Sequence, residues 1–458
     1  MSDEKIIIIG AGLAGSLLSI YLAKRGIEVE VYEARADMRN KEMSAGRSIN
    51  LALSDRGIKA LSEVGMDAYM LREAVSMNGR LVHDTEGNTK LFPYSGREGE
   101  YINSVSRGGL NIALINEADN YPESRFFFEQ RCVDFDCRSG EALFFNEKNG
   151  DEYKVTGRTV IATDGAGSAV RRAMLRGGVP RFNYSQEFLD HGYKELSIPS
   201  GEGSEFRMEK NALHIWARRS FMMIALPNFD GSYTCTLFLA HKGGNSFESI
   251  DTGEYSGGSP GSALIRFFEG QFPDAIPLIG NLEREYFTNP TGDLGTIKCF
   301  PWNAGDRCLL LGDSAHAIVP FYGQGMNASF EDCRILNELI DELGTDWLKV
   351  FERYSELRKV NTDAIADMAV ENFYEMRDAV ADPVFVRKRE LETKLEQENP
   401  NYFSKYSMVT FREDLPYSEA MRLGNAQDRI LMEICAREPD ISKIDTEKVL
   451  ERIRAIAV

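Results

Sequence analysis

Three glycines near the start of the chain and one later carboxylate have the types and spacing of a phosphate-binding turn. Gly10, Gly12 and Gly15 follow the apolar run 5–9 and open a predicted helix, and Glu33 ends the next apolar run. Glycines let backbone N–H groups approach a pyrophosphate at a helix N-terminus, and a carboxylate at this spacing accepts hydrogen bonds from a ribose. The pattern therefore predicts a site for an ADP moiety. The alternative, a glycine-rich turn beside a surface glutamate, does not require this order of strand, turn, helix and strand.

Two later apolar runs, 157–167 and 306–316, also stop at an aspartate beside a glycine. The carboxyl ends of parallel strands lie at one edge of a sheet, so we expect Asp164 and Asp313 near the first turn. A simple nicotinamide dehydrogenase needs only the first motif, whereas a dinucleotide with a ribityl chain needs further hydroxyl acceptors. Asp313 is well placed to be one of them. The three strand ends together predict FAD.

The segment 320–327, PFYGQGMN, supplies a rigid proline and two glycines and carries no charged side chain. Glycines leave the face of a flat ring open to the backbone, and a helix predicted from Gly325 would direct N–H groups at the polar edge of that ring. A helix N-terminus stabilises negative charge, which a reduced flavin carries. We call residues 320–327 the ring seat and expect the flavin ring of FAD to lie against it.

The elements that must position these residues predict a discontinuous α/β fold. The first strand, turn, helix and strand indicate a parallel sheet, whereas the runs 219–228 and 231–243 alternate as strands of a half-exposed sheet do. From about residue 345 the apolar pattern is helical. We expect a Rossmann-like FAD-binding domain made of 1–75, 100–180 and 297–344, an inserted β-sheet substrate domain made of 76–99 and 181–296, and a helical C-terminal domain, 345–458.

Charge and composition restrict the partners. The chain has 71 acidic and 53 basic residues, and its formal charge of −18 repels nucleic acid and anionic membranes. The seven cysteines are scattered, and no stretch reaches the roughly 18 apolar residues that span a bilayer. We expect a soluble, cytoplasmic protein without nucleic-acid or membrane partners. The five histidines lack metal-ligand spacing, so we assign no metal, and the oligomeric state is not predicted.

These motifs resemble those of the class A flavoprotein aromatic hydroxylases, and the resemblance covers nearly the whole chain. The matching signatures are Gly10, Gly12 and Gly15 with Glu33, then Asp164-Gly165 with Ser168 and Arg171, then Gly312-Asp313. Shorter segments are similar, in the same order, to the kynurenine 3-monooxygenase family. They are VYEAR, GRSINLALSDRG, YINSVSRGGLN, HGYKEL, TCTLF, VPFYGQGMN, NFYEMRD and YSMVTF.

The resemblance implies an NADPH- and O2-dependent hydroxylation of L-kynurenine to 3-hydroxykynurenine, a step of tryptophan degradation. In that family NADPH reduces FAD, O2 adds to form a flavin C4a-hydroperoxide, and its distal oxygen attacks the substrate ring. The aniline nitrogen of kynurenine activates the ring carbon, so we assign no catalytic side chain. The implied partners are small molecules: L-kynurenine, NADPH and O2.

The resemblance also implies the contact residues. Those toward FAD are Gly10, Gly12, Gly15, Glu33, Ala34, Arg35, Ala52, Arg107, Cys132, Asp164, Asp313, Gly325, Met326 and Asn327. The residues expected to hold the amino-acid end of the substrate are Arg80, Tyr94, Asn372 and Tyr406. Those expected around its aromatic end are Ile224, Leu226, Phe238, Phe321 and Met376.

Some of these residues also have plainer interpretations. Arg80 alone could be a solvated surface residue, although an arginine with two tyrosines matches a carboxylate. Asn372 falls on an apolar helical stripe, where a buried amide needs either a neighbouring backbone group or a ligand as its partner. Tyr322 stands where the family loop often has histidine, so no hydrogen bond is carried over to that position.

Other functions share part of the pattern. Another class A hydroxylase, acting on a phenolic or anthranilate-like acid, would share the FAD motifs and differ only among the residues that hold the amino-acid end. A flavin halogenase would carry W-x-W-x-I-P, which this chain lacks. A prenyl-protein escort factor has a related fold but would not need Asp313 and the ring seat. The motifs do not distinguish NADPH from NADH.

Overall fold

The computed structural model describes residues 5–40, 50–378 and 382–456. Its first unit is a six-stranded sheet that carries the glycine and aspartate motifs at its edge. Across the sheet the strands are β18 (Asn303–Ala304), β19 (Cys308–Leu310), β12 (Thr159–Ala162), β1 (Ile6–Ile9), β2 (Val29–Tyr32) and β8 (Ser124–Phe127). All neighbouring pairs are parallel except β18 with β19. Every residue of β1 and β2 is buried, as expected for a covered parallel sheet.

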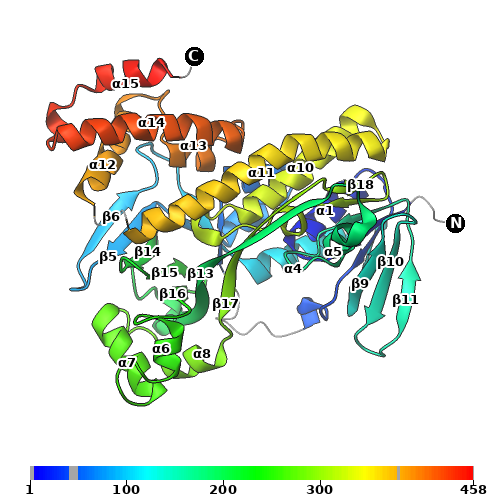
Figure 1. Cartoon of the computed structure of the whole chain (residues 1–458), viewed down its shortest axis with the longest axis horizontal. Helices are drawn as coiled ribbons and strands as arrows, with labels where there is room; N and C mark the ends of the chain where they lie inside the picture. The colour runs from blue at the N-terminus through cyan, green and yellow to red at the C-terminus, as the bar shows by residue number, and fades with distance from the viewer. Residues whose placement is uncertain (1–4, 41–49, 379–381, 457–458) are drawn as a thin grey trace.

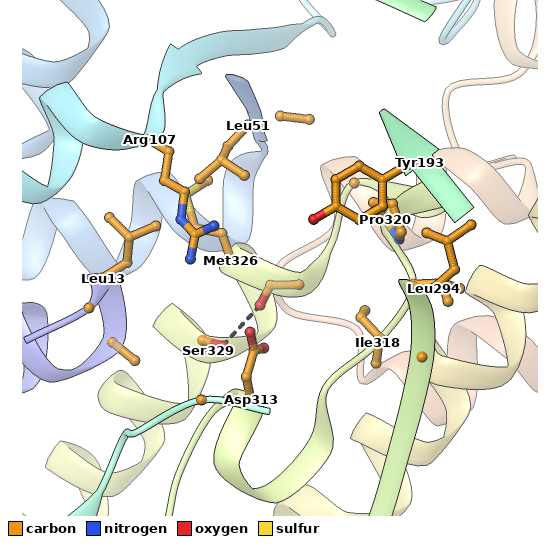
Figure 2. A pocket seen from close by; sticks show the side chains of 18 of the residues that line it. Leu13, Leu51, Arg107, Tyr193, Leu294, Asp313, Ile318, Pro320, Met326 and Ser329 are labelled. Carbon is orange, nitrogen blue, oxygen red and sulfur yellow. Dashed lines mark hydrogen bonds between the residues drawn. The ribbon is translucent and has the colours of Figure 1, made fainter. Parts of the chain in front are cut away.

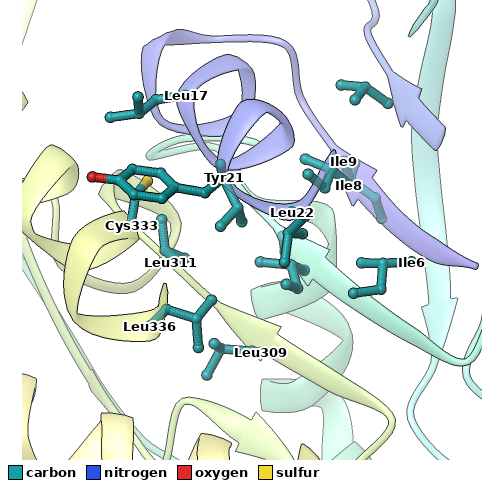
Figure 3. Close-up of a cluster of buried hydrophobic side chains, with 14 of the residues drawn as sticks. Ile6, Ile8, Ile9, Leu17, Tyr21, Leu22, Leu309, Leu311, Cys333 and Leu336 are labelled. Atoms are coloured by element: carbon teal, nitrogen blue, oxygen red, sulfur yellow. The ribbon is translucent and has the colours of Figure 1, made fainter. Parts of the chain in front are cut away.

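The core of this unit joins the sheet to two helices, α1 (Leu13–Ala23) and α10 (Gly325–Leu343). Figure 3 shows Leu17, Tyr21 and Leu22 of α1 in one cluster with the isoleucines of β1 and Leu336 of α10. The Tyr21 hydroxyl donates to the carbonyl oxygen of Ala60 at 2.7 Å, so its polar end is satisfied inside the cluster. The shared core fixes the start of α1 and the start of α10 relative to each other, and both starts border the predicted cofactor site.

Shorter elements surround this sheet. Two three-stranded sheets consist of β9 (Gln130–Asp136), β10 (Glu141–Asn146) and β11 (Glu152–Val155), and of β3 (Asn50–Leu53), β7 (Ile102–Ser106) and β4 (Val75–Met77). The helices of this part are α2 (Asp55–Glu63), α3 (Asp67–Arg72), α4 (Arg107–Ala118), α5 (Ala169–Ala173) and α9 (Asp313–His316). The short helical turns of the chain are η1 (Met38–Asn40), η2 (Met174–Gly178), η3 (Glu202–Ser204), η4 (Pro320–Tyr322) and η6 (Ile441–Lys443).

A seven-stranded sheet forms the second unit. Its order is β17 (Gly292–Phe300), β13 (Asn183–Ile198), β16 (Tyr233–Ala240), β15 (Met222–Pro227), β14 (Ala212–Ala217), β5 (Gly79–His83) and β6 (Thr89–Pro93). The hairpin β5–β6 therefore joins strands that lie more than a hundred residues later in the chain. Successive side chains of each strand point to opposite faces of this sheet, and each face is apolar and packs against different elements.

One face of the seven-stranded sheet packs on three helices that the sequence did not predict. They are α6 (Phe247–Asp251), α7 (Pro260–Gln271) and α8 (Leu282–Thr288), seen together at the lower edge of Figure 1. The other face, which includes Met222, Leu226 and Phe238, packs toward the ring seat and the C-terminal helices. The site therefore lies on the face that α6–α8 leave free.

The C-terminal part is helical from residue 347 onward, as predicted. Its helices are α11 (Trp347–Asp378), α12 (Pro383–Glu398), α13 (Lys405–Phe411), α14 (Tyr417–Arg437) and α15 (Thr446–Arg454). Figure 1 shows α12 to α15 gathered at one end, beside β5 and β6. The helix α11 contacts α10, β14 and α14, and so it touches all three predicted units. The exact domain boundaries stay a prediction. Within the described ranges, no helix is long and apolar enough to cross a membrane.

Candidate active site

A cavity of about 850 Å³ runs from the edge of the six-stranded sheet to the free face of the seven-stranded sheet. Figure 2 shows Arg107 and Asp313 reaching into it from one side and Tyr193 and Leu294 from the other. All the site residues that the sequence predicts line this cavity except Gly15, Asn327 and Asn372. Segments far apart in the chain are thus brought to one continuous space.

The glycine turn begins at the end of β1. Gly10 has φ of 101°, a conformation that favours glycine, and a Cβ there would lie 2.6 Å from the Thr163 carbonyl oxygen. A Cβ on Gly15 would lie 2.0 Å from the Gly10 carbonyl oxygen, so this glycine allows α1 to pack against the turn. Gly12, the N-cap of α1, provides no side-chain cap, which leaves the first N–H groups of the helix to an anion. Gly15 therefore shapes the turn and does not line the cavity.

Glu33 is buried at the end of β2 and has several protein partners. One carboxylate oxygen accepts from the Ala11 N–H at 2.8 Å, and the other accepts from Arg35 Nε at 2.7 Å. Burial raises the pKa of Glu33, but the hydrogen bonds and charge of Arg35 and the Ala11 N–H outweigh burial and hold this pKa below its usual range. Glu33 is therefore ionised, and it fixes the glycine turn as well as presenting an acceptor to the cavity.

The two later aspartates supply acceptors farther along the same cavity. The Oδ2 atom of Asp164 accepts from the Ala169 N–H at 2.7 Å, whereas its buried Oδ1 has no hydrogen-bond partner within the described residues. Asp313 has exposed surface because it faces the cavity, but the surrounding protein limits its hydration and raises its pKa, against the charges of His316 and Arg107. An orphaned carboxylate oxygen and a second enclosed carboxylate fit the hydroxyl donors of FAD.

The ring seat consists of η4 followed by Gly323 and the first turn of α10. Gly323 has φ of 69°, and its Cβ would lie 3.0 Å from that of Ala52. Figure 2 also shows the Ser329 hydroxyl, which donates to the Gly325 carbonyl oxygen at 3.0 Å. Residues 320–326, apart from Gln324, line the cavity. The predicted helix start at Gly325 is confirmed.

Asn327 holds the seat from behind. Its amide nitrogen donates to the carbonyl oxygens of Ala52 at 2.8 Å and Gly323 at 2.9 Å, and its amide oxygen accepts from the Ser54 N–H at 3.0 Å. These three bonds tie the seat to β3 and the start of α2. The side chain is fully buried and does not line the cavity, so the structure gives Asn327 a supporting role, and its predicted contact with FAD stays a prediction.

Asn372 supports the same segment from α11. Its amide nitrogen donates to the Phe321 carbonyl oxygen at 2.6 Å and lies 3.4 Å from the sulfur of Met376. The side chain is 4% exposed and is not part of the cavity lining. Of the two partners considered from the sequence, a backbone group or a ligand, the structure has the backbone group.

At the substrate end, Arg80 lies against two stacked tyrosines. The Tyr94 and Tyr406 rings are 5.4 Å apart at 12°, and the Arg80 guanidinium carbon is 4.7 Å from the Tyr406 ring centre and 5.9 Å from that of Tyr94. The buried Nε of Arg80 has no hydrogen-bond partner in the described chain. Burial raises the pKa of both tyrosines, so both hydroxyls stay protonated donors. This arrangement can bind a carboxylate.

Apolar side chains surround the space between this end and the ring seat. They are Ile224, Leu226, Phe238, Phe321 and Met376, all predicted, together with Tyr193, Leu213, Met222, Leu294 and Tyr322, which the predicted site lacked. Met222 could have been found from the sequence, because Met222, Ile224 and Leu226 alternate along β15 and so share one face. No group of His, Cys, Asp and Glu side chains suited to a metal occurs within the described residues.

Comparison with known proteins gives the family. The sequence matches the family described as FAD binding domain over residues 3–220 and 294–368. It is 46% identical over 453 residues to the kynurenine 3-monooxygenase of Myxococcus xanthus, which covers 99% of this chain and 95% of the relative. It is 42% identical over 446 residues to that of Legionella pneumophila, covering 97% and 96%, and 41% identical over 458 residues to that of Dictyostelium discoideum, covering 97% and 96%.

Solved structures agree in fold. A 2-methyl-3-hydroxypyridine-5-carboxylic acid oxygenase superposes with a TM-score of 0.64 at 18% identity, covering 92% of this chain and 96% of that one. A p-nitrophenol 4-monooxygenase from Pseudomonas putida superposes with a TM-score of 0.64 at 16% identity, covering 94% and 97%. The predicted fold class is confirmed, and so is the use of FAD. Because its relatives match at 41–46% identity over nearly the full length of both chains, the chain belongs to the kynurenine 3-monooxygenase family of FAD-dependent monooxygenases.

Proposed function

We propose that the protein hydroxylates L-kynurenine to 3-hydroxykynurenine with NADPH and O2 as co-substrates. The observation that carries the proposal is the continuity of the cavity, which joins the glycine turn, the ring seat and the Arg80–tyrosine end. The relatives that bear the kynurenine 3-monooxygenase name support the same substrate.

The chain's own residues would bind, orient and enclose the substrate. Arg80 with Tyr94 and Tyr406 suits the α-carboxylate, and the apolar walls from β15 and β16 suit the aromatic ring and exclude water from it. When bound, FAD supplies the redox chemistry that takes electrons from NADPH and inserts one atom of O2 into the ring. The N-terminus of α10 favours negative charge at the seat. Positioning is thus the main task of the protein, and no side chain is needed as a general base.

NADPH rather than NADH, and a cytoplasmic location, are parts of this proposal that rest on the sequence and the resemblance. The alternative substrate is another phenolic or anthranilate-like acid. Such a substrate would use the same FAD motifs but would lack the zwitterionic end for which Arg80 and the two tyrosines are suited.

The test is NADPH oxidation by the FAD-loaded enzyme with and without L-kynurenine, with the products identified by mass. We expect strong stimulation and a product heavier by one oxygen atom. Arg80→Ala should raise the KM for kynurenine steeply and retain FAD, whereas Arg284→Ala, on the far face of the seven-stranded sheet, should behave as wild type. Stimulation with only peroxide formed would make kynurenine an effector, and no stimulation would move the assignment to the alternative substrate class.

A further inference from the structure

Tyr322 lies where the ring seat meets the substrate end. It closes η4, and its side chain is 6% exposed and lines the cavity. Among the described residues its hydroxyl makes no hydrogen bond, although the ring is tightly packed. Because Tyr322 lines the cavity, this hydroxyl is open to a ligand that brings an acceptor.

The ring of Tyr322 extends the aromatic stack already formed at the substrate end. The Tyr322 and Tyr406 rings are 5.4 Å apart at 19°, and Tyr406 in turn stacks on Tyr94 at 5.4 Å and 12°. Arg80 lies over the middle ring at 4.7 Å. The three tyrosines therefore form one wall that begins in the ring seat and ends beside the guanidinium.

The charged neighbours of Tyr322 have both signs. Burial raises its pKa well above the usual range, the charge of Glu375 and the Tyr406 phenol raise it further, and Arg80 opposes them. Glu375 and Arg80 themselves border one small side cavity, and the charges of both act on the Tyr322 hydroxyl. Charges of both signs suit a zwitterion, and the raised pKa keeps the phenol a protonated donor at neutral pH.

We propose that Tyr322 is a substrate-binding residue whose hydroxyl donates a hydrogen bond to the carboxylate of an α-amino-acid substrate, next to the contact made by Arg80. The proposal rests on the function proposed above and deepens it. Tyr322 then sets the distance between the flavin seat and the charged end of the substrate, because it is part of the seat itself. Tyr322 thereby makes the site selective for amino acids over aromatic acids whose carboxylate lies closer to their aromatic ring.

The test is Tyr322→Phe in the FAD-loaded enzyme, which removes the hydroxyl and keeps the ring in the stack. Binding is measured by titrating L-kynurenine and following the flavin absorbance change, alongside the analogue that lacks only the carboxylate. We expect kynurenine to bind roughly ten- to a hundredfold more weakly to the variant, the effect of a lost hydrogen bond to a charged group. The analogue should bind equally to both proteins. Tyr69→Phe, an exposed tyrosine on α3, is the matched control and should match wild type for both ligands.

Equal affinity of wild type and Tyr322→Phe for kynurenine, while Arg80→Ala binds it poorly, would show that Tyr322 only packs and would overturn the proposal. An equal loss of affinity for kynurenine and the analogue would place the contact at another acceptor and would also overturn it. Failure of the wild-type enzyme to bind kynurenine at all would instead refute the proposed function, and this inference with it. Unchanged flavin spectra and melting temperature in Tyr322→Phe establish that its fold is intact.

Discussion

Replacing Asn372 by leucine tests how the ring seat is held. The amide of Asn372, itself buried, donates at 2.6 Å to the carbonyl oxygen of Phe321, which belongs to a buried apolar cluster. Leucine preserves the approximate volume but cannot donate, so the Phe321 carbonyl oxygen loses its partner. An unsatisfied buried carbonyl costs about 1–3 kcal/mol.

The cost should appear first in the affinity for FAD. If the seat adopts its ordered form mainly around the flavin ring, about 1–3 kcal/mol corresponds to a roughly 5- to 150-fold higher Kd for FAD. If the seat is ordered in both states, the same energy lowers the melting temperature by about 2–4 °C per kcal/mol for a domain of 150–250 residues. The assay is quenching of flavin fluorescence on titration with the apoprotein, together with thermal melting. Glu352→Gln, on the exposed face of the same helix, is the control and should change neither.

A third outcome would refute this reasoning. If Asn372→Leu keeps the wild-type affinity for FAD and the wild-type melting temperature but shows a raised KM for kynurenine, then Asn372 contacts the substrate. The amide would in that case have to leave the Phe321 carbonyl oxygen when the substrate binds.

Three further changes test other contacts. Gly15→Ala places a Cβ 2.0 Å from a carbonyl oxygen of the glycine turn and should yield protein with little FAD by absorbance ratio, whereas Gly270→Ala, with no atom within 4 Å, should retain it. Burial raises the pKa of Asp313, so its ionisation at neutral pH destabilises the apoprotein. Asp313→Asn should therefore have a higher melting temperature than wild type at neutral pH, lose this gain in acid, and bind FAD more weakly. A lower melting temperature at neutral pH would contradict this. Burial alone would raise the pKa of Asp274, but hydrogen bonds from His83 and from the indole of Trp216 outweigh burial and lower this pKa. Its stabilisation is therefore present at neutral pH and lost in acid, so Asp274→Asn should melt below wild type at pH 7, with the gap closing toward pH 3.

The nucleotide-binding half of the fold could be predicted because its signals are local. The strand before Gly10, the helix after it and the carboxylate at Glu33 all lie within one short segment, and each position has a backbone or charge requirement that few residue types meet. The same holds for the ring seat, whose glycines and helix start at Gly325 follow from residues within eight positions.

The helices α6, α7 and α8 were missed although two of them carry start signals. Ser246 and Ser249 form a capping box at the start of α6, and Ser259 caps α7 with Pro260 at its first position. The alternating strands on both sides favoured a continuous sheet and outweighed these signals. These caps mark where helices interrupt the β-rich segment.

The roles of the two asparagines could not be derived from the sequence, because a buried amide gives no indication of which backbone it meets. The resemblance implies that Asn327 contacts FAD, and it does not indicate the hydrogen bonds that the side chain makes with Ala52, Gly323 and Ser54. Resemblance carries a residue's importance from one chain to another, but the atom it contacts depends on segments that pack from far along the chain.

Gln324 joins the ring seat to the C-terminal helices. Its amide oxygen accepts from the Tyr417 hydroxyl of α14 at 2.9 Å, in the middle of the ring seat. Tyr417 in turn lies 4.0 Å beneath the guanidinium of Arg56, which donates to the Val409 carbonyl oxygen and pairs with Glu331 of α10 at 2.6 Å. A buried cation with these partners cannot lose one of them without a large cost, since the charge would remain in the protein interior. The seat therefore depends on α13 and α14 as much as on its own glycines, and a shift of those helices must move the backbone on which the flavin ring is expected to lie.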